Sequence, residues 1–354
     1  MVKKFLCVCT LAMAILLQSV TVSYAEDKIP AEENVENTLT ASEQNPSSGV
    51  STENSEITAE EIERQLEKSK TDQEQLKKDQ EQLRKDQEQL KKEQEQLKKD
   101  QEQLKKEQEQ LKKDREKLDI ENKRKKLTED ITDNTYLNYI KDLGYYKSTS
   151  KSDEKLNIRN ALLLFQSNHN MSVTGKWDAA TKAMLIDRLL SEEFTYADTI
   201  KEAPSTGKWI VVNKTKRTLT LYEGEKALKK YAVAVGNPAS LTKSGKFFVN
   251  MKIVDPDWGG GGFAKPVKGG TPQNPLGSRW MGINRTDGSY GVHGTNSFYS
   301  IGTYASHGCI RMQNYCVEEL YTLIPMEAAV WVGTQDELTK WGVTQPAFKL
   351  QPAL

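Results

Sequence analysis

A histidine and a cysteine stand two residues apart in the segment SHGCIRM, at 306–312. A cysteine is a strong nucleophile when a base takes its proton and backbone N–H groups stabilise the oxyanion that follows. His307 and His293 are the candidate bases, and either imidazolium would lower the pKa of the Cys309 thiol from its ordinary value of about 8.5. Gly308 lets backbone amides approach a carbonyl oxygen closely. These residue types also suit a buried structural thiol, so from the residues alone both interpretations stay open.

The first 25 residues indicate the compartment in which this cysteine would work. Two lysines precede an apolar run over 5–17, and the small residues of SYA predict cleavage of a secretory signal after Ala25. The two cysteines of the signal leave with it. The exported protein then keeps Cys309 and Cys316, too few for a disulfide scaffold. A disulfide between these two is one alternative, and a zinc site formed by Cys309 and the two nearby histidines, His293 and His307, is another.

Charge and low-complexity patterns divide the N-terminal part of the chain. Acidic and basic residues balance at 50 each, so no global field favours nucleic acid or an anionic membrane as a partner. Residues 26–57 are acidic and rich in Ser, Thr and Asn, which predicts a disordered leader. Over 58–130 the repeat QEQLKKD or QEQLKKE places leucine at every seventh position. This period predicts a helix on the order of 100 Å long.

The helix of 58–130 has a weak seam for self-association. Glutamine occupies the heptad position that would complete an apolar seam with leucine, so only half of the seam is apolar. The helix is expected to be either a weak coiled coil or a solvated spacer that projects the C-terminal part outward.

A small helical domain is expected over 131–191. Apolar residues recur at helical spacing in three stretches, at 137–143, 158–165 and 178–190. Asp178 is placed to cap the third helix. His169 falls in a polar stretch and is predicted to be an exposed loop residue. The polar segment 192–207 is predicted to be a linker.

The stretches YIKDLGYY and ALLLFQSNHNMSVTGKWDAATKAML in this region resemble the three-helix peptidoglycan-binding domain found beside many cell-wall enzymes. The shared features are a Leu-Gly-Tyr end to the first helix, a Phe-Gln pair and a Val, Gly and Thr pattern. The resemblance covers about 134–190 and implies that peptidoglycan glycan is a partner.

The pattern changes to that of β-strands over 208–333. β-Branched and aromatic residues partly alternate in WIVVN, RTLTLYE, YAVAVG and KFFVNMKIV. The Gly- and Pro-rich stretch 255–280 is too long for a hairpin, and long ordered loops are usually functional. QNYCVEELYTLI predicts a helix with Cys316 as a buried free thiol. A tail over 334–354 carries one short helix at DELTKW. The expected fold class is therefore multidomain: a signal peptide, a long α-helical or coiled-coil stalk, a small all-α domain and a mainly β domain.

The stretch VHGTNSFYSIGTYASHGCIRM resembles the signature of the L,D-transpeptidase catalytic domain, and NPLGSRWMGI upstream also resembles that family. The resemblance covers about 208–333. It implies that Cys309 is the nucleophile, that His293 is the general base and that the backbone carbonyl of Gly294 fixes the tautomer of His293. Backbone amides of His307, Gly308 and Cys309 would form the oxyanion hole.

Further residues of the motif are implied to support the turn and the substrate pocket: Ser306, His307, Arg311, Thr295 and Tyr290. Arg311 suits a substrate carboxylate, although a structural ion pair is equally open. Lys243 stands where the family commonly has the proline of a Thr-Pro-Thr-Gly run. We expect that loop to lie away from the motif, so that its shape changes and the chemistry does not.

The reaction implied by the resemblance uses peptidoglycan stem peptides and needs no metal or other cofactor. The thiolate attacks the carbonyl of the third residue of a tetrapeptide stem, D-alanine leaves, and an amine of another stem resolves the thioester into a cross-link. Water as the acceptor would make the enzyme an L,D-carboxypeptidase. A non-catalytic wall-binding spacer is the alternative from another class. The expected location is outside the cytoplasmic membrane, in the cell wall or on the extracellular or periplasmic side.

Overall fold

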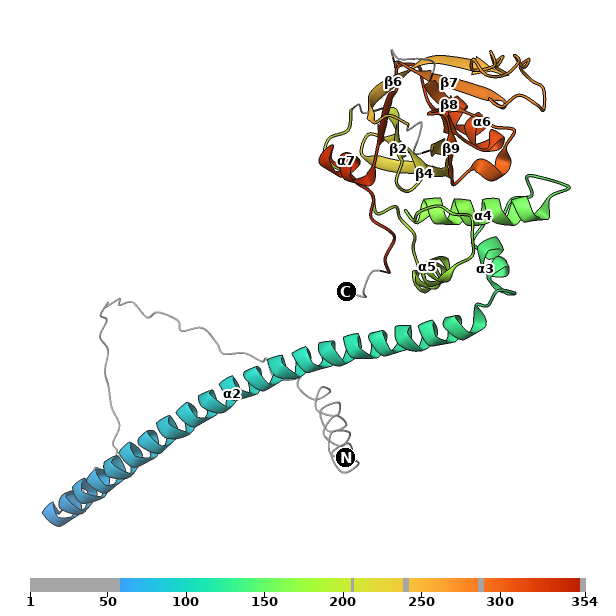
Figure 1. The fold of residues 1–354 in the computed structure, drawn as a ribbon. Helices are drawn as coiled ribbons and strands as arrows, with labels where there is room; N and C mark the ends of the chain where they lie inside the picture. Colours follow the sequence, from blue (N-terminus) through green and yellow to red (C-terminus); the bar gives the residue numbers. More distant parts are fainter. Residues whose placement is uncertain (1–57, 205–206, 238–241, 286–289, 351–354) are drawn as a thin grey trace, which may run out of the picture. The chain divides into compact units, whose positions relative to one another are not determined.

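The computed structural model describes residues 58–204, 207–237, 242–285 and 290–350 (Figure 1). The expected signal peptide and leader lie outside the described residues. Within the described ranges, no helix has the combined length and hydropathy that a bilayer span requires. The chain divides into two units after Glu88, and each is described by itself.

The long helix α2 runs over Ala59–Asp130, as the heptads predict. Its heptad leucines are exposed, from 48% at Leu104 to 70% at Leu111. Contacts between residues four apart support the helix, such as the 3.0 Å ion pair between Glu81 and Lys85, each contributing a few tenths of a kcal/mol. The coiled coil stays a prediction.

Three helices form the next part of the chain: α3 (Tyr136–Asp142), α4 (Glu154–Asn168) and α5 (Ala179–Leu190). The side chain of Asp178 accepts a 2.8 Å hydrogen bond from Thr181 N and caps α5, as expected. Ile140, Phe165 and Leu185 are completely buried at the centre of the three helices. The apolar spacing therefore identified the core of this module.

The prediction of an exposed His169 is wrong. His169 is 1% exposed at the C-terminal end of α4, and its Nδ1 lies 2.7 Å from the carbonyl oxygen of Phe165. Aromatic rings of Phe194 and Phe348 cover it, and burial lowers its pKa to about 4. The covering residues are remote in sequence, so the polar neighbours of His169 gave no sign of them.

An eight-stranded curled sheet forms the centre of the β domain, in the order β10-β8-β7-β6-β11-β2-β3-β4. Its strands are β2 (Lys208–Asn213), β3 (Thr218–Glu223), β4 (Lys226–Ala232), β6 (Gly245–Val254), β7 (Arg279–Ile283), β8 (Tyr290–His293), β10 (Ile310–Arg311) and β11 (Ala329–Gly333). Pairs β11–β2 and β10–β8 are parallel. The other pairs in this sheet are antiparallel.

Short elements complete the domain: β1 (Thr199–Ile200), β5 (Val235–Gly236), η1 (Phe298–Ser300), β9 (Tyr304–Ser306), α6 (Asn314–Leu323), α7 (Gln335–Lys340) and β12 (Val343–Thr344). The strand predicted at 231–236 is split, because Ala234 bridges to Arg311 between β4 and β5. Helix α6 places Val317 and Leu320 in the core of the sheet, and Cys316 is a buried free thiol as predicted.

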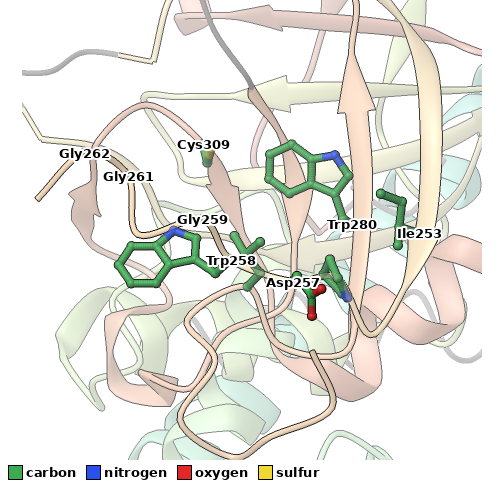
Figure 2. Close-up of a pocket in the computed structure, with 10 residues that line it drawn as sticks. Ile253, Asp257, Trp258, Gly259, Gly261, Gly262, Trp280 and Cys309 are labelled. Atoms are coloured by element: carbon green, nitrogen blue, oxygen red, sulfur yellow. The ribbon is translucent and has the colours of Figure 1, made fainter. Parts of the chain in front are cut away.

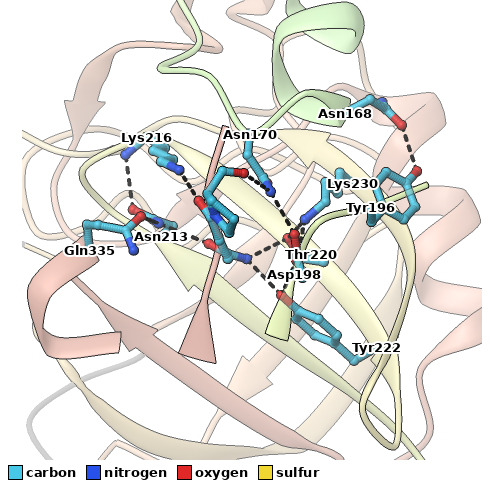
Figure 3. A network of polar contacts seen from close by, with 12 residues as sticks. Asn168, Asn170, Tyr196, Asp198, Asn213, Lys216, Thr220, Tyr222, Lys230 and Gln335 are labelled. Carbon is cyan, nitrogen blue, oxygen red and sulfur yellow. Dashed lines mark hydrogen bonds and ion pairs between the residues drawn. The ribbon is translucent and has the colours of Figure 1, made fainter. Parts of the chain in front are cut away.

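The segments expected to be a linker and a tail are parts of the fold. Strand β1, from the predicted linker, pairs antiparallel with β12, from the predicted tail. Asp198 forms a 2.5 Å ion pair with Lys230 of β4, and both side chains are at most 1% exposed. Tyr222 also donates to this carboxylate (Figure 3). Gln345 donates to the Tyr222 hydroxyl. Burying a charge is costly unless it is paired, so this network fixes both segments.

Helix α4 contributes residues to two hydrophobic cores. Phe165 packs among the three helices, whereas Leu163 packs with Ala234 and Ile301 of the β domain. Arg159 of α4 donates to the Ile301 carbonyl oxygen at 2.5 Å. Because apolar packing and hydrogen bonds both cross this boundary, the helical module is a fixed part of the same body as the β domain.

Replacing Lys230 by Met should lower the free energy of unfolding by about 3–5 kcal/mol, because Asp198 would be left buried and unpaired. The matched control is Lys229→Met. Lys229 pairs with Glu319 at the surface, with side chains 46% and 43% exposed, so its loss should cost at most about 1 kcal/mol. Urea denaturation of both variants measures the difference. Equal losses would contradict the structural role of the buried pair.

Candidate active site

Two short strands bring the separated parts of the motif together. Strand β8 ends at His293, and β10 begins directly after Cys309. Their parallel register pairs Arg311 with His293 and Ile310 with Val292. Side chains alternate between the two faces of a sheet, so Cys309, Arg311 and His293 are on one face. All three line the same cavity.

The ring of His293 is held in one orientation. Its Nδ1 lies 2.6 Å from the backbone carbonyl oxygen of Gly294, which can only accept a hydrogen bond. Nδ1 therefore carries the proton and Nε2 is the unprotonated nitrogen that can act as a base. The Trp280 ring stacks on His293 at a centroid distance of 5.6 Å and an interplanar angle of 23°. These two residues are direct partners between β7 and β8.

Burial keeps the Cys309 and His293 pair neutral at rest. His293 is only 4% exposed. Burial, with a smaller contribution from the nearby Arg311 charge, lowers its pKa to about 4. Burial also raises the pKa of the Cys309 thiol above its usual value. The imidazolium expected to lower the thiol pKa is therefore absent near neutral pH, because the site disfavours both charges.

Ser306 closes the turn that carries Cys309. Its Oγ donates to the Cys309 carbonyl oxygen at 2.6 Å and accepts from the Gly308 amide at 3.1 Å. Gly308 has φ +125°, and a Cβ there would come within 2.6 Å of the Tyr290 ring. A glycine is thus required for both conformation and space. An oxyanion hole that uses the Gly308 amide must first break its bond to Ser306.

The loop that contains Lys243 does not lie away from the motif, contrary to the expectation. Thr242, the residue before Lys243, is 3% exposed and donates from Oγ1 to the Gly308 carbonyl oxygen at 2.9 Å. The same Oγ1 accepts from Gly236 N at 2.7 Å. Thr242 therefore braces the turn of Cys309 from the far side. The contact joins positions 66 residues apart, a separation at which local sequence patterns carry no information.

Cys309 lies where two cavities meet. The first, of about 500 Å³, is lined by Trp258, Trp280, Ile253 and the glycine-rich loop (Figure 2). The second, of about 270 Å³, is lined by residues that include Tyr290 and His293. Cys309 therefore forms part of the wall of both cavities.

Cationic groups adjoin the second cavity. Arg311 lines it, and no carboxylate in the described part of the chain forms an ion pair with Arg311. The Arg285 guanidinium lies 3.3 Å from the centroid of the Tyr290 ring, which forms part of the cavity wall. His307 is exposed at the mouth, beside the ring of Phe263.

Thr295 does not line either cavity at Cys309. It is buried, and its amide donates to Oδ1 of Asn314 at 3.0 Å. A Cβ at Gly277 or at Gly294 would come within 2.2 Å of the same oxygen. Asn314 thus holds the backbone next to His293 in place. Sequence reasoning missed this residue, whose only signal is its position at the start of the helix that follows the motif.

Neither a disulfide nor a zinc site at Cys309 is supported by the structure. Cys309 and Cys316 are both free thiols, so they do not form a disulfide. Among the described residues, no group of three His, Cys, Asp or Glu side chains is arranged to hold a metal ion.

Comparisons with known proteins relate part of this chain to a family. The family model YkuD, the L,D-transpeptidase catalytic domain, matches residues 207–332. "Putative L,D-transpeptidase YqjB" of Bacillus subtilis is 39% identical over 127 residues, which cover 35% of this chain and 70% of that protein. "Putative L,D-transpeptidase YkuD" of Bacillus subtilis is 34% identical over 116 residues, covering 33% of this chain and 60% of that protein. A solved L,D-transpeptidase from Xylanimonas cellulosilytica has a TM-score of 0.40 and 21% identity, over 55% of this chain and 90% of that one.

The neutral resting pair predicts a particular pH dependence of alkylation. Iodoacetamide reacts with thiolate, and the raised pKa of Cys309 means that thiolate accumulates only at high pH. The rate at Cys309, followed by peptide mass spectrometry, should rise without a plateau from about pH 6 to about pH 9. A plateau below about pH 7 would instead indicate a thiolate–imidazolium pair. Cys316, whose pKa burial raises to about 12, should stay unmodified as an internal control.

Proposed function

The chain belongs to the YkuD family of L,D-transpeptidases, and from this premise we propose that it cross-links peptidoglycan stems through a thioester on Cys309. The observation that carries the proposal is the position of Cys309 between two cavities, beside a histidine whose Nε2 is unprotonated. A thiol in the wall of two cavities suits a ping-pong reaction, in which one substrate leaves an acyl group that a second substrate collects.

The first half-reaction forms the thioester. Nε2 of His293 takes the Cys309 proton while Sγ attacks the carbonyl carbon of the third stem residue, and the developing charge moves to the carbonyl oxygen. The histidine then gives its proton to the departing nitrogen, so the C–N bond breaks and D-alanine leaves. The 2.6 Å bond from Nδ1 to the Gly294 carbonyl keeps the ring in place as the imidazolium forms.

The oxyanion would be stabilised by the backbone amides of the turn, as the resemblance implies for His307, Gly308 and Cys309. The Gly308 amide donates to Ser306 Oγ at 3.1 Å. A bond from this amide to an oxyanion would be stronger than its bond to the neutral hydroxyl, which favours the exchange. Thr242 and Ser306 hold the two carbonyl groups of the turn, so that the amides stay directed by the backbone.

The second half-reaction transfers the acyl group to an amine. His293 takes a proton from the attacking amine, a C–N bond forms, the C–S bond breaks and the thiol is restored. Arg311 gives the second cavity a cation for a substrate carboxylate. Ser306 and Thr295 support the backbone, while Tyr290 and His307 form the wall and mouth of the cavity.

The proposed location is outside the cytoplasmic membrane, where peptidoglycan is found. The proposal rests on the signal-like sequence before Ala25. In this arrangement α2 would act as a spacer, with weak self-association through its exposed leucines. Terminal sequencing of the exported protein should give Glu26 as the first residue, and a retained Met1 would refute cleavage.

Incubation of the protein with a disaccharide-tetrapeptide tests the reaction by intact mass. We expect an acyl adduct on Cys309, loss of D-alanine and a cross-linked dimer. Cys309→Ala should abolish the adduct, and His293→Ala should slow its formation about 10²–10⁴-fold. The buried thiol supplies the control, since Cys316→Ala should retain the adduct.

The products distinguish a transpeptidase from a carboxypeptidase and from a spacer. A tripeptide without dimer would replace transpeptidation by L,D-carboxypeptidation. Binding of the fragment without an adduct in any variant would mean that the protein is a wall-binding spacer.

A further inference from the structure

Two polar grooves lie next to the active site without including Cys309 or His293. One, of about 560 Å³, is formed by the start of α4 and the start of α6, with Asn160 and Glu318 in its wall. The other, of about 280 Å³, has Asp255 and Asn274 in its wall. Phe298 and Asn314 belong to both, so the grooves adjoin.

The chemistry of the two grooves differs from that of the cavities at Cys309. Their lining, taken over the described residues, contains hydroxyl, amide and carboxylate groups and no lysine or arginine. An anionic ligand would find no counter-charge there. A neutral ligand rich in hydroxyl and amide groups would find both donors and acceptors. The ring of Phe298, 38% exposed, offers an apolar surface between the two grooves.

Bonds between the helical module and the β domain shape the larger groove in advance. Nε2 of the buried Gln313 donates to Oδ1 of Asn160 in α4 at 2.9 Å and to the carbonyl oxygen of Phe298 at 3.0 Å. Asp153, also in the lining, caps α4 and accepts from the hydroxyl of Tyr299 at 2.8 Å. A rigid site loses less entropy when a ligand binds.

We propose that the two grooves together bind the glycan strand of peptidoglycan, as a chain of N-acetylated hexosamines. The proposal rests on the proposed function, because the glycan matters only if the stems attached to it react at Cys309. Asn314, shared by both grooves, accepts from Thr295 two residues beyond His293, so the bound strand would run beside the catalytic strand. Holding the strand there raises the effective concentration of its stems at Cys309.

The site is a joint one. Asn160 and Asp153 come from the helical module, whereas Phe298 and Gln313 come from the β domain. The glycan would therefore be recognised by the boundary between the two parts, and not by the helical module alone. A lysine-rich peptide is the competing ligand, since Glu318 and Asp255 are acidic. Asp153 is a third carboxylate of the lining, so the lysine-rich peptide is titrated beside the glycan.

Chitotetraose, a peptide-free oligomer of N-acetylglucosamine, tests binding by calorimetry on the full chain. Phe298→Ala should weaken its binding about tenfold, the effect of losing one well-placed aromatic contact. The matched control is Phe248→Ala. That phenylalanine is 43% exposed on β6 and lines neither the grooves nor the two Cys309 cavities, so its loss should leave chitotetraose binding unchanged. A melting curve of each variant verifies folding, and Glu318→Ala, with a similar expected loss, is the second variant.

Several results would overturn the proposal. These are wild-type chitotetraose binding in both groove variants, equal losses in Phe298→Ala and Phe248→Ala, and binding of a lysine-rich peptide in place of chitotetraose. A second readout is the ratio of kcat/KM for a glycan-linked tetrapeptide to that for the free tetrapeptide. Phe298→Ala should reduce this ratio about tenfold through KM. Failure of the wild-type protein to turn over both the glycan-linked and the free tetrapeptide would refute the proposed function, whereas the chitotetraose titration would still report on the grooves.

Discussion

The parallel pairing of β8 with β10 is the constraint on which the rest of the site depends. The pairing contains only two residue pairs, yet it determines that Cys309 and His293 share a face. A shift by one residue would turn the cysteine to the opposite face of the sheet. A ladder of two residue pairs does not fix its own register. Contacts from neighbouring segments hold the register instead. The bridge from Ala234 to Arg311 holds β10 from its other side, and Asn314 holds the backbone that follows His293.

The need to hold Cys309 in place also accounts for the residues that contact its turn. Ser306 and Thr242 each bind one of its carbonyl groups, and the Tyr290 ring occupies the space that a side chain at position 308 would need. Interactions with the turn therefore come from three different segments of the chain. Such a surrounding restricts the positions that the thiol can take, as the proposed role of Cys309 requires.

Local patterns predicted the regular elements well and the long-range contacts poorly. The heptads predicted α2, the apolar spacing predicted α4 and α5, and the alternating residues predicted β2, β3 and β6, because each pattern reflects the period of its element. The motif likewise predicted that His293 and Cys309 belong to one site. The burial of His169, the ion pair of Asp198 with Lys230 and the brace at Thr242 depend on residues far apart in the chain. Sequence periodicity does not reveal such contacts. Polar residues such as these are usually predicted to lie on the surface.

The neutral state of Cys309 and His293 affects how readily the cysteine is oxidised. Oxidation of cysteine by peroxide proceeds through the thiolate, so susceptibility follows thiolate character. Burial raises the pKa of Cys309 and lowers that of His293, so the site favours the thiol over the thiolate. The thiol form is the one that peroxide oxidises slowly. The desolvation that shapes the site thus also limits oxidation of its cysteine.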